Sequence, residues 1–297
     1  MANSSHFLNE CFEKAVSEKC VNYFDYNEFS EFEEIAEGAF GIIRKSEWKD
    51  SLKVAVKSLK INTHTDENTV NDFIKELKLL RKIWFHPNIN TFYGVIKDPF
   101  NGYCMVLEFA NNGNLRQYLK INFSNLNWKS KLRMTKEIAS GLSFLHNHNI
   151  IHRDLHSKNI LVSEGKMKIG DFGLSTSLNS NSCKNSKAHC SNYGMPAYVE
   201  PQYFKNPNYE FTQKSDIYSL GVILWEISSG KPPYQSFNSV DCIAVHVFQG
   251  KRETPIEGTP QAYVNLYTKC WDEDPHKRPD AELVFKTLDL FLTSEMS

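Results

Sequence analysis

The chain has 297 residues, 41% of them hydrophobic and 23% charged, and its formal net charge is −1 at pH 7. This balance gives no sign of a polyanion-binding protein, so we expect no nucleic-acid partner. Seven cysteines without any C-x-x-C pair argue against a disulfide framework and for a reducing compartment.

The first third of the chain is predicted to be rich in strands. Residues 1–28 are a polar extension, with a short helix expected over Asn9 to Lys19. The segments that follow read as strands joined by glycine and polar turns. Apolar residues at helical spacing then predict a helix from Thr69 to Trp84. Two more strands are expected over Thr91 to Ile96 and Tyr103 to Phe109.

After Ala110 the chain is predicted to be mostly helical from Leu115 onward. The long helices expected there are Trp128 to His146, Thr212 to Ser229, Val240 to Gln249, Pro260 to Trp271 and Asp280 to Leu292. The stretch from His152 to Phe204 interrupts them with a long polar loop, and loops of that length are usually functional or disordered. We therefore expect a small β-rich lobe and a larger helical lobe, joined near residue 110.

The most informative motif is the string I-I-H-R-D-L-H-S-K-N-I-L-V-S-E-G-K-M-K-I-G-D-F-G at residues 150–173. Asp154 could orient a hydroxyl nucleophile, while the Asn159 amide oxygen and the Asp171 carboxylate are hard oxygen ligands for magnesium. The short apolar runs that follow Asn159 and precede Asp171 predict a tight hairpin. Such a hairpin would hold both polar clusters on one face.

Two further motifs suggest phosphate binding. In E-G-A-F-G-I-I, Gly38 and Gly41 lie between two strands, where backbone N–H groups can approach phosphate oxygens closely. The pattern is neither a dinucleotide fingerprint nor a P-loop, because the glycines lead into a strand and no G-K-[ST] follows. In V-A-V-K, Lys57 could contact phosphates, and either Glu76 or Asp72 on the next helix could pair with it.

These motifs stand in the order found in eukaryotic protein kinases, and the chain resembles that family over roughly residues 29 to 292. The matching strings are E-G-A-F-G-I-I, V-A-V-K, Glu76, H-P-N-I, H-R-D-L-H-S-K-N, D-F-G, S-D-I-Y-S-L-G and C-W-D-E-D-P-H-K-R-P. The last of these, together with N-N-G-N-L, is similar to the tyrosine-kinase and tyrosine-kinase-like branches.

The resemblance implies an α+β, two-lobed protein kinase fold. Its parts would be an N-terminal extension (1–28), an N-lobe (29–108), a hinge (108–113), a C-lobe (114–292) and a tail (293–297). It also implies that Lys57 holds the α- and β-phosphates of ATP, with Glu76 as its ion-pair partner. Asp154 would accept or orient the substrate hydroxyl proton, and Asn159 and Asp171 would hold Mg²⁺.

Other residues take roles by the same resemblance. The ATP-binding set would be Gly38, Ala39, Phe40, Gly41, Ile43, Ala55, Lys57, Leu107, Glu108, Ala110 and Leu161. Within it, Leu107 would guard the back of the adenine pocket, and Glu108 to Ala110 would supply backbone hydrogen bonds. The hydrophobic column that marks an assembled active site would be Leu80, Phe92, His152 and Phe172, with Asp216 at its base.

Two positions depart from the family pattern. Ala36 stands where the first loop glycine is usual, so we expect altered nucleotide affinity rather than loss of function. Glu200-Pro201-Gln202 replaces the usual A-P-E, whose glutamate pairs with an arginine matching Arg278. Gln202 could keep a hydrogen bond to that arginine but not the charge, which would weaken the support of the substrate-binding loop.

The acceptor residue stays open. Serine/threonine kinases usually carry lysine two residues after the catalytic aspartate and threonine in G-T-x-x-Y, and here these positions hold His156 and Met195. Lys158 stands where many tyrosine kinases have arginine. Because the tyrosine-kinase-like branch is mostly serine/threonine-specific, we expect Ser/Thr in preference to Tyr and leave dual specificity open.

The loop after D-F-G offers several phosphorylation sites. The candidates are Thr176, Ser177, Ser182, Ser186, Ser191 and Tyr193. Arg153 could pair with a phosphate on this loop and order it.

The motif set therefore predicts an ATP- and Mg²⁺-dependent protein kinase that acts on a protein substrate in intracellular signalling. The alternative is a pseudokinase that serves as a nucleotide-binding scaffold or allosteric partner, supported by Ala36 and E-P-Q. The first residues lack the basic and apolar regions of a signal peptide. The apolar run Leu220 to Trp225 is far shorter than the roughly 20 residues of a membrane span. We expect a cytoplasmic or nucleocytoplasmic protein without a membrane span, and the oligomeric state stays unknown.

Overall fold

The structure is a computed structural model that describes residues 21–38, 41–58, 67–177, 195–206, 208–237 and 239–294. It divides into two compact units, each treated separately below. The N-terminal unit runs to Asn111 and includes Asp171–Gly173; the C-terminal unit comprises Asn112–Gly170 and the chain from Leu174. The helix expected over Asn9 to Lys19 lies outside the described residues.

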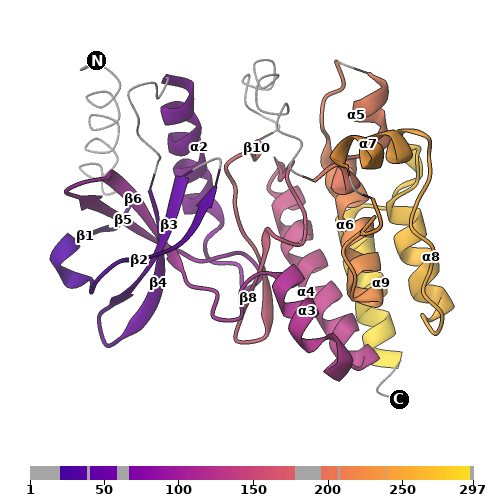
Figure 1. Cartoon of the computed structure of the whole chain (residues 1–297), viewed down its shortest axis with the longest axis horizontal. Coiled ribbons are helices and arrows are strands. Elements are labelled where there is room, and N and C mark those ends of the chain that lie inside the picture. The colour runs from indigo at the N-terminus through magenta and orange to yellow at the C-terminus, as the bar shows by residue number, and fades with distance from the viewer. Residues whose placement is uncertain are drawn as a thin grey trace. The chain divides into compact units, whose positions relative to one another are not determined.

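A mixed sheet forms most of the N-terminal unit (Figure 1). In the described part of the chain its strands are β1 (Tyr23–Phe24), β2 (Glu33–Gly38), β3 (Gly41–Trp48), β4 (Leu52–Ser58), β5 (Phe92–Asp98) and β6 (Gly102–Glu108). Their order is β1-β5-β6-β4-β3-β2, and only the β1–β5 pair is parallel. The unit also contains the 3₁₀ turn η1 (Tyr26–Glu28) and the helix α2 (Glu67–Ile83).

The alternation of side chains along β4 separates the two faces of this sheet. Val54 and Val56 belong to a buried cluster with Ile96, Cys104 and Val106. Aromatic side chains pack against that cluster, and they are Phe24, Tyr26, Phe29, Phe32, Trp48 and Tyr93. The residues between the two valines and after them, Ala55 and Lys57, therefore point to the opposite face.

Helices dominate the C-terminal unit. Its main helices are α3 (Leu115–Asn122), α4 (Trp128–Asn147), α6 (Gln213–Ser229), α7 (Val240–Phe248), α8 (Gln261–Cys270) and α9 (Ala281–Ser294). In Figure 1, α4 runs beside α6 and α9, and α8 lies against α6. Almost every side chain of α6 is buried, which fits its apolar run V-I-L-W.

Short elements connect these helices. They are η2 (Phe123–Asn125), β7 (Ile150–Ile151), β8 (Ile160–Ser163), β9 (Lys166–Ile169), β10 (Thr176–Ser177), η4 (Pro196–Tyr198), α5 (Pro201–Lys205) and η5 (Pro275–Lys277). The strands β8 and β9 form the predicted hairpin, closed by Glu164 and Gly165, both with positive φ. The prediction of a β-rich first part and a helical second part is confirmed.

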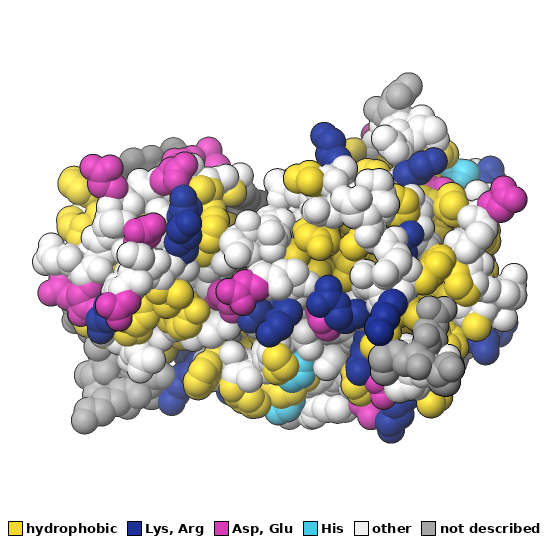
Figure 2. All heavy atoms as spheres, turned by 90° about the horizontal axis from the view of Figure 1, so that it is seen from below, with side chains coloured by type: hydrophobic (Ala, Val, Ile, Leu, Met, Phe, Trp, Pro, Cys, Tyr) yellow, Lys and Arg dark blue, Asp and Glu magenta, His cyan; other side chains and the backbone are white. Residues whose placement is uncertain are grey.

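The face of the molecule seen in Figure 2 carries basic and acidic side chains interspersed with hydrophobic ones. This mixture agrees with the nearly neutral net charge of the chain. Among the described helices, none combines the length and the apolar character that a bilayer crossing requires.

Candidate active site

In the N-terminal unit, a buried lysine lies between two carboxylates. Lys57 extends from β4 toward α2, where its Nζ donates to Glu76 Oε1 at 2.7 Å and Oε2 at 2.9 Å. The same Nζ lies 3.1 Å from Asp171 Oδ1. Glu76 reaches it because the helix turns its stripe of Phe73, Leu77 and other apolar residues inward. The structure thus selects Glu76 as the partner, and the side chain of Asp72 lies outside the described residues.

The three charged groups of this cluster differ in burial, and the two carboxylates control the pKa of Lys57. Burial by itself would lower the pKa of Lys57, but the carboxylates of Asp171 and Glu76 outweigh it and hold the pKa above its usual value. Lys57 therefore stays protonated at neutral pH. The Asp171 side chain is 36% exposed, whereas those of Lys57 and Glu76 are only 6% and 4% exposed. One carboxylate thus faces solvent, and the ion pair behind it is buried.

Several residues of the predicted ATP-binding set lie in the same unit. Strand pairing places Ala55 opposite Leu107 and Ile43 opposite Lys57. Gly38 and Gly41 pair at the end of the β2–β3 ladder, while Ala39 and Phe40 lie outside the described residues. Glu108 and Ala110 follow at the end of β6 and are partly exposed. Leu161 belongs to β8 in the C-terminal unit.

In the C-terminal unit, a buried carboxylate fixes the start of the loop that carries Asp154. Asp216 of α6 accepts hydrogen bonds at 2.9 Å from the backbone N–H groups of both His152 and Arg153. Its Oδ2 also contacts His146 Nε2 at 2.9 Å. These bonds hold Arg153 at φ 71°, a left-handed conformation that costs a non-glycine residue free energy. The buried His152 ring in turn contacts the Gly170 carbonyl at 3.0 Å.

Asp154 and Asn159 contact each other directly. The Asn159 Nδ2 donates to Asp154 Oδ2 at 3.1 Å and to the Asp154 carbonyl at 2.9 Å. Since the nitrogen of this amide faces Asp154, its oxygen is the atom that could bind a cation. Sequence and structure therefore agree in grouping these two residues on one loop. The column residues Leu80, Phe92 and Phe172 are buried in the N-terminal unit, and His152 is buried in the C-terminal unit.

A second buried network beneath this loop was not predicted. The Ser157 hydroxyl, the Tyr198 hydroxyl and the Glu226 carboxylate contact one another, and Arg116 of α3 donates to all three. Burial raises the pKa of Glu226, although Arg116 and the hydroxyl donors oppose this shift. The sequence held one signal, since an acid within the apolar run of α6 needs a buried partner. Nothing in the sequence indicated that Arg116 was that partner.

The proposed phosphorylation sites are only partly described. Thr176 and Ser177 form β10 and pair with Ile151 and Ile150. The other candidates lie outside the described residues, namely Ser182, Ser186, Ser191 and Tyr193. The guanidinium of Arg153 lies 5.7 Å from the centre of the Phe211 ring. Regulation through this loop stays a prediction.

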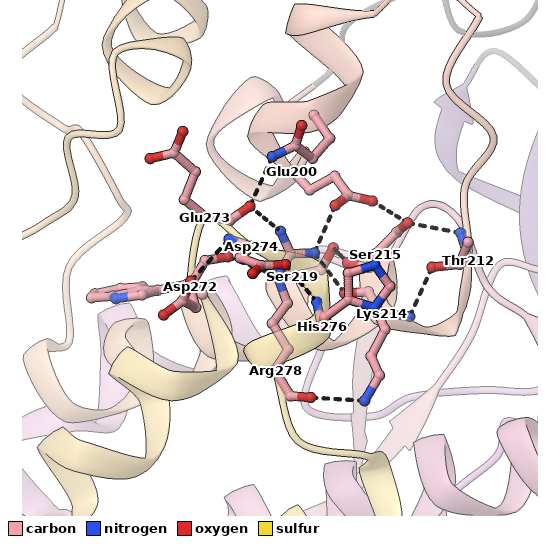
Figure 3. Close-up of polar contacts among 12 residues, drawn as sticks. Glu200, Thr212, Lys214, Ser215, Ser219, Asp272, Glu273, Asp274, His276 and Arg278 are labelled. Atoms are coloured by element: carbon pink, nitrogen blue, oxygen red, sulfur yellow. Dashed lines mark hydrogen bonds and ion pairs between the residues drawn. The ribbon is translucent and has the colours of Figure 1, made fainter.

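The expectation for E-P-Q was wrong. The charged partner of Arg278 is Glu200: Arg278 Nη1 lies 2.7 Å from Glu200 Oε2, and both side chains of this ion pair are fully buried. Figure 3 shows the Glu200 carboxylate between Arg278 and Ser215, whose hydroxyl also donates to it. Gln202 donates to the Glu273 carbonyl at 3.0 Å, and Arg278 Nη2 donates to the same oxygen at 3.3 Å. Glu200, two residues before Gln202, therefore supplies the carboxylate that pairs with Arg278.

Comparisons with known proteins agree with this geometry. The family model described as protein tyrosine and serine/threonine kinase matches residues 29–288. The serine/threonine/tyrosine-protein kinase HT1 of Arabidopsis thaliana is 33% identical over 95% of this chain and 71% of its own length. The serine/threonine-protein kinase VIK of the same plant is 32% identical, over 97% and 66%.

A protein of Dictyostelium discoideum named as a probable serine/threonine-protein kinase is 33% identical over 89% of this chain. The chain spans only 28% of that relative, so relatives of very different total length share this region. The match to the family model covers both units and every motif described above. The chain therefore belongs to the protein tyrosine and serine/threonine kinase family and is a protein kinase domain.

Proposed function

We propose that this kinase domain is active and transfers the γ-phosphoryl group of ATP to a hydroxyl group of a protein substrate. The observation that carries the proposal is the Lys57 ammonium held by Glu76 and Asp171. A fixed, permanently protonated lysine is suited to binding nucleotide phosphates, and two carboxylates set its direction. Catalysis would rest on positioning and on neutralising charge at the transferring group.

The donor groups fit a magnesium ion. Asp171 and Asn159 each offer an oxygen, the ligand type that Mg²⁺ prefers. In the part of the chain that the structure describes, no group of three or more His, Cys, Asp or Glu side chains could hold a metal by itself. In proteins, Mg²⁺ is usually bound through one or two carboxylates together with substrate phosphates and water. When bound, Mg²⁺ would neutralise the charge of the β- and γ-phosphates.

Asp154 is proposed to orient the acceptor hydroxyl and to receive its proton. Its carboxylate side chain is 33% exposed, so a substrate hydroxyl can approach it. Asn159 holds one carboxylate oxygen, which limits rotation of the group. The position of the proton acceptor is therefore fixed before a substrate binds.

We propose serine or threonine as the preferred acceptor, with tyrosine as the second possibility. The names of the three relatives support this order, since all of them include serine/threonine and one adds tyrosine. Phosphorylation of peptide arrays with Ser, Thr or Tyr as the single acceptor tests it. A preference for Tyr peptides would reverse the assignment.

The variant Asp154→Asn tests the proposed activity. We expect phosphotransfer from labelled ATP to fall by about 10²–10⁴-fold, because a positioned proton acceptor contributes that much, while nucleotide binding persists. Wild-type turnover in the variant would refute the assignment of Asp154. Absence of turnover in the wild-type protein with ATP and Mg²⁺ would favour the pseudokinase alternative. That alternative has lost one support, because Glu200 supplies the charge that E-P-Q seemed to lack.

A further inference from the structure

The imidazole of His156 has a fixed orientation in the loop that carries Asp154. The backbone N–H of Asn159 donates to His156 Nδ1 at 3.1 Å and to the His156 carbonyl at 2.9 Å. Because a backbone N–H can only donate, Nδ1 must accept, and the neutral ring carries its proton on Nε2. That N–H is therefore directed away from Asn159 N and toward the other side of the loop.

The Nε2 atom of this ring faces the proposed proton acceptor. It lies 3.6 Å from Asp154 Oδ1, slightly beyond a hydrogen bond but within the range of a favourable electrostatic contact. The other carboxylate oxygen, Oδ2, accepts from Asn159 Nδ2 at 3.1 Å. The Asp154 carboxylate is thus flanked on one side by His156 and on the other by Asn159. The His156 side chain is 12% exposed.

The same ring is supported from the segment that follows the long loop. The Tyr198 ring meets the His156 ring edge to face, with centroids 6.0 Å apart. The Tyr198 hydroxyl is itself fixed, because Arg116 Nη2 donates to it at 2.7 Å and Ser157 Oγ lies 3.1 Å away. Glu226 completes this network. Rotation of His156 would therefore disturb a buried hydrogen-bonded network as well as the loop.

We propose that His156 is a positioning residue for phosphoryl transfer, which holds the Asp154 carboxylate and the Asn159 backbone in one loop conformation. It would do so through two separate atoms. Nδ1 accepts the hydrogen bond from the Asn159 backbone N–H, and Nε2–H faces the Asp154 carboxylate. The inference rests on the proposed role of Asp154. It assigns a function to the histidine at the position where serine/threonine kinases usually have lysine.

Three variants of the full chain distinguish the contribution of Nδ1 from that of Nε2. His156→Asn keeps an oxygen acceptor near the place of Nδ1, His156→Gln keeps an N–H donor near the place of Nε2, and His156→Ala keeps neither. For His156→Ala we expect kcat to fall by about 100-fold, since small misplacements of catalytic groups can cost that much. The KM for ATP should stay within about twofold. Each amide variant should recover part of the lost kcat.

Turnover is measured with a peptide substrate, and thermal unfolding is recorded for each variant. Wild-type kcat in His156→Ala would overturn the inference. So would a loss of kcat that is equal in all three variants and parallels their loss of thermal stability, because His156 would then only stabilise the fold. Asp154→Asn serves as the control: if it retains wild-type turnover, the proposed role of Asp154 fails, and if the wild-type protein shows no turnover, the proposed function fails. If Asp154→Asn is inactive and His156→Ala is not, only the role of His156 fails.

Discussion

Replacing Glu200 with glutamine should destabilise the C-terminal unit strongly. The variant keeps the size of the side chain but leaves the Arg278 guanidinium buried without its carboxylate. Removing one partner of a buried ion pair costs about 3–5 kcal/mol. Arg278 would still donate to the carbonyl groups of Lys214 and Asp272, at 2.9 and 2.8 Å. We therefore expect the free energy of unfolding to fall by about 3 kcal/mol, near the lower end of that range.

Thermal and urea unfolding followed by circular dichroism measure this loss. For a chain of 297 residues, the entropy of unfolding is about 0.6 kcal/mol/K, so a loss of 3 kcal/mol corresponds to a fall in Tm of roughly 5 °C. Gln202→Ala is the matched control: it removes one partly exposed hydrogen bond to the Glu273 carbonyl, so it should cost only about 1 kcal/mol. Equal losses in the two variants would refute the reasoning.

Two further predictions concern the N-terminal unit. Burial opposes ionisation of Asp98, but hydrogen bonds from Arg44 and from backbone N–H groups outweigh it and hold its pKa below the usual value. The stabilisation by the Asp98 carboxylate is therefore present above the unfolded pKa of about 3.9 and is lost as pH falls through the lower folded pKa. The free energy of urea unfolding of Asp98→Asn should therefore differ less from that of the wild type below pH 4 than at pH 6. A difference that stays constant with pH would contradict this. Gly94→Ala would place a Cβ against the Asn22 carbonyl and separate β1 from β5. Hydrogen exchange of the Val95 amide, which donates to Asn22 at 2.9 Å, should accelerate, and unchanged exchange would show that the strand tolerates the methyl group.

Local patterns predicted most of the regular structure. The helix expected over Trp128 to His146 is observed as Trp128–Asn147, and the helix expected over Thr212 to Ser229 begins one residue later, at Gln213. Both rest on apolar periodicity and on side-chain caps that are encoded within a few residues. The strand Tyr23–Phe24 was not predicted, because a two-residue edge strand is defined by its partner β5 and not by its own sequence.

The same distinction explains which parts of the candidate site could be predicted. Asp154 and Asn159 are five residues apart, so one loop brings them into contact, and the motif already placed both in one candidate site. Arg116 and Glu226 are separated by 110 residues, and their contact depends on how α3 and α6 pack. A motif covers only neighbouring residues, so it could not predict this pair.

The E-P-Q segment shows how a motif can mislead even when it is aligned correctly. A motif assigns the charge to one position, but the physical requirement is a carboxylate within reach of the buried Arg278 guanidinium. Glu200 and Gln202 lie on either side of Pro201, the first residue of α5, so their side chains leave the backbone in different directions. The chain meets the requirement from the position before the helix, and the position after Pro201 is free to carry a neutral residue. A missing motif charge is therefore evidence of lost function only after the neighbouring positions have been searched for a substitute.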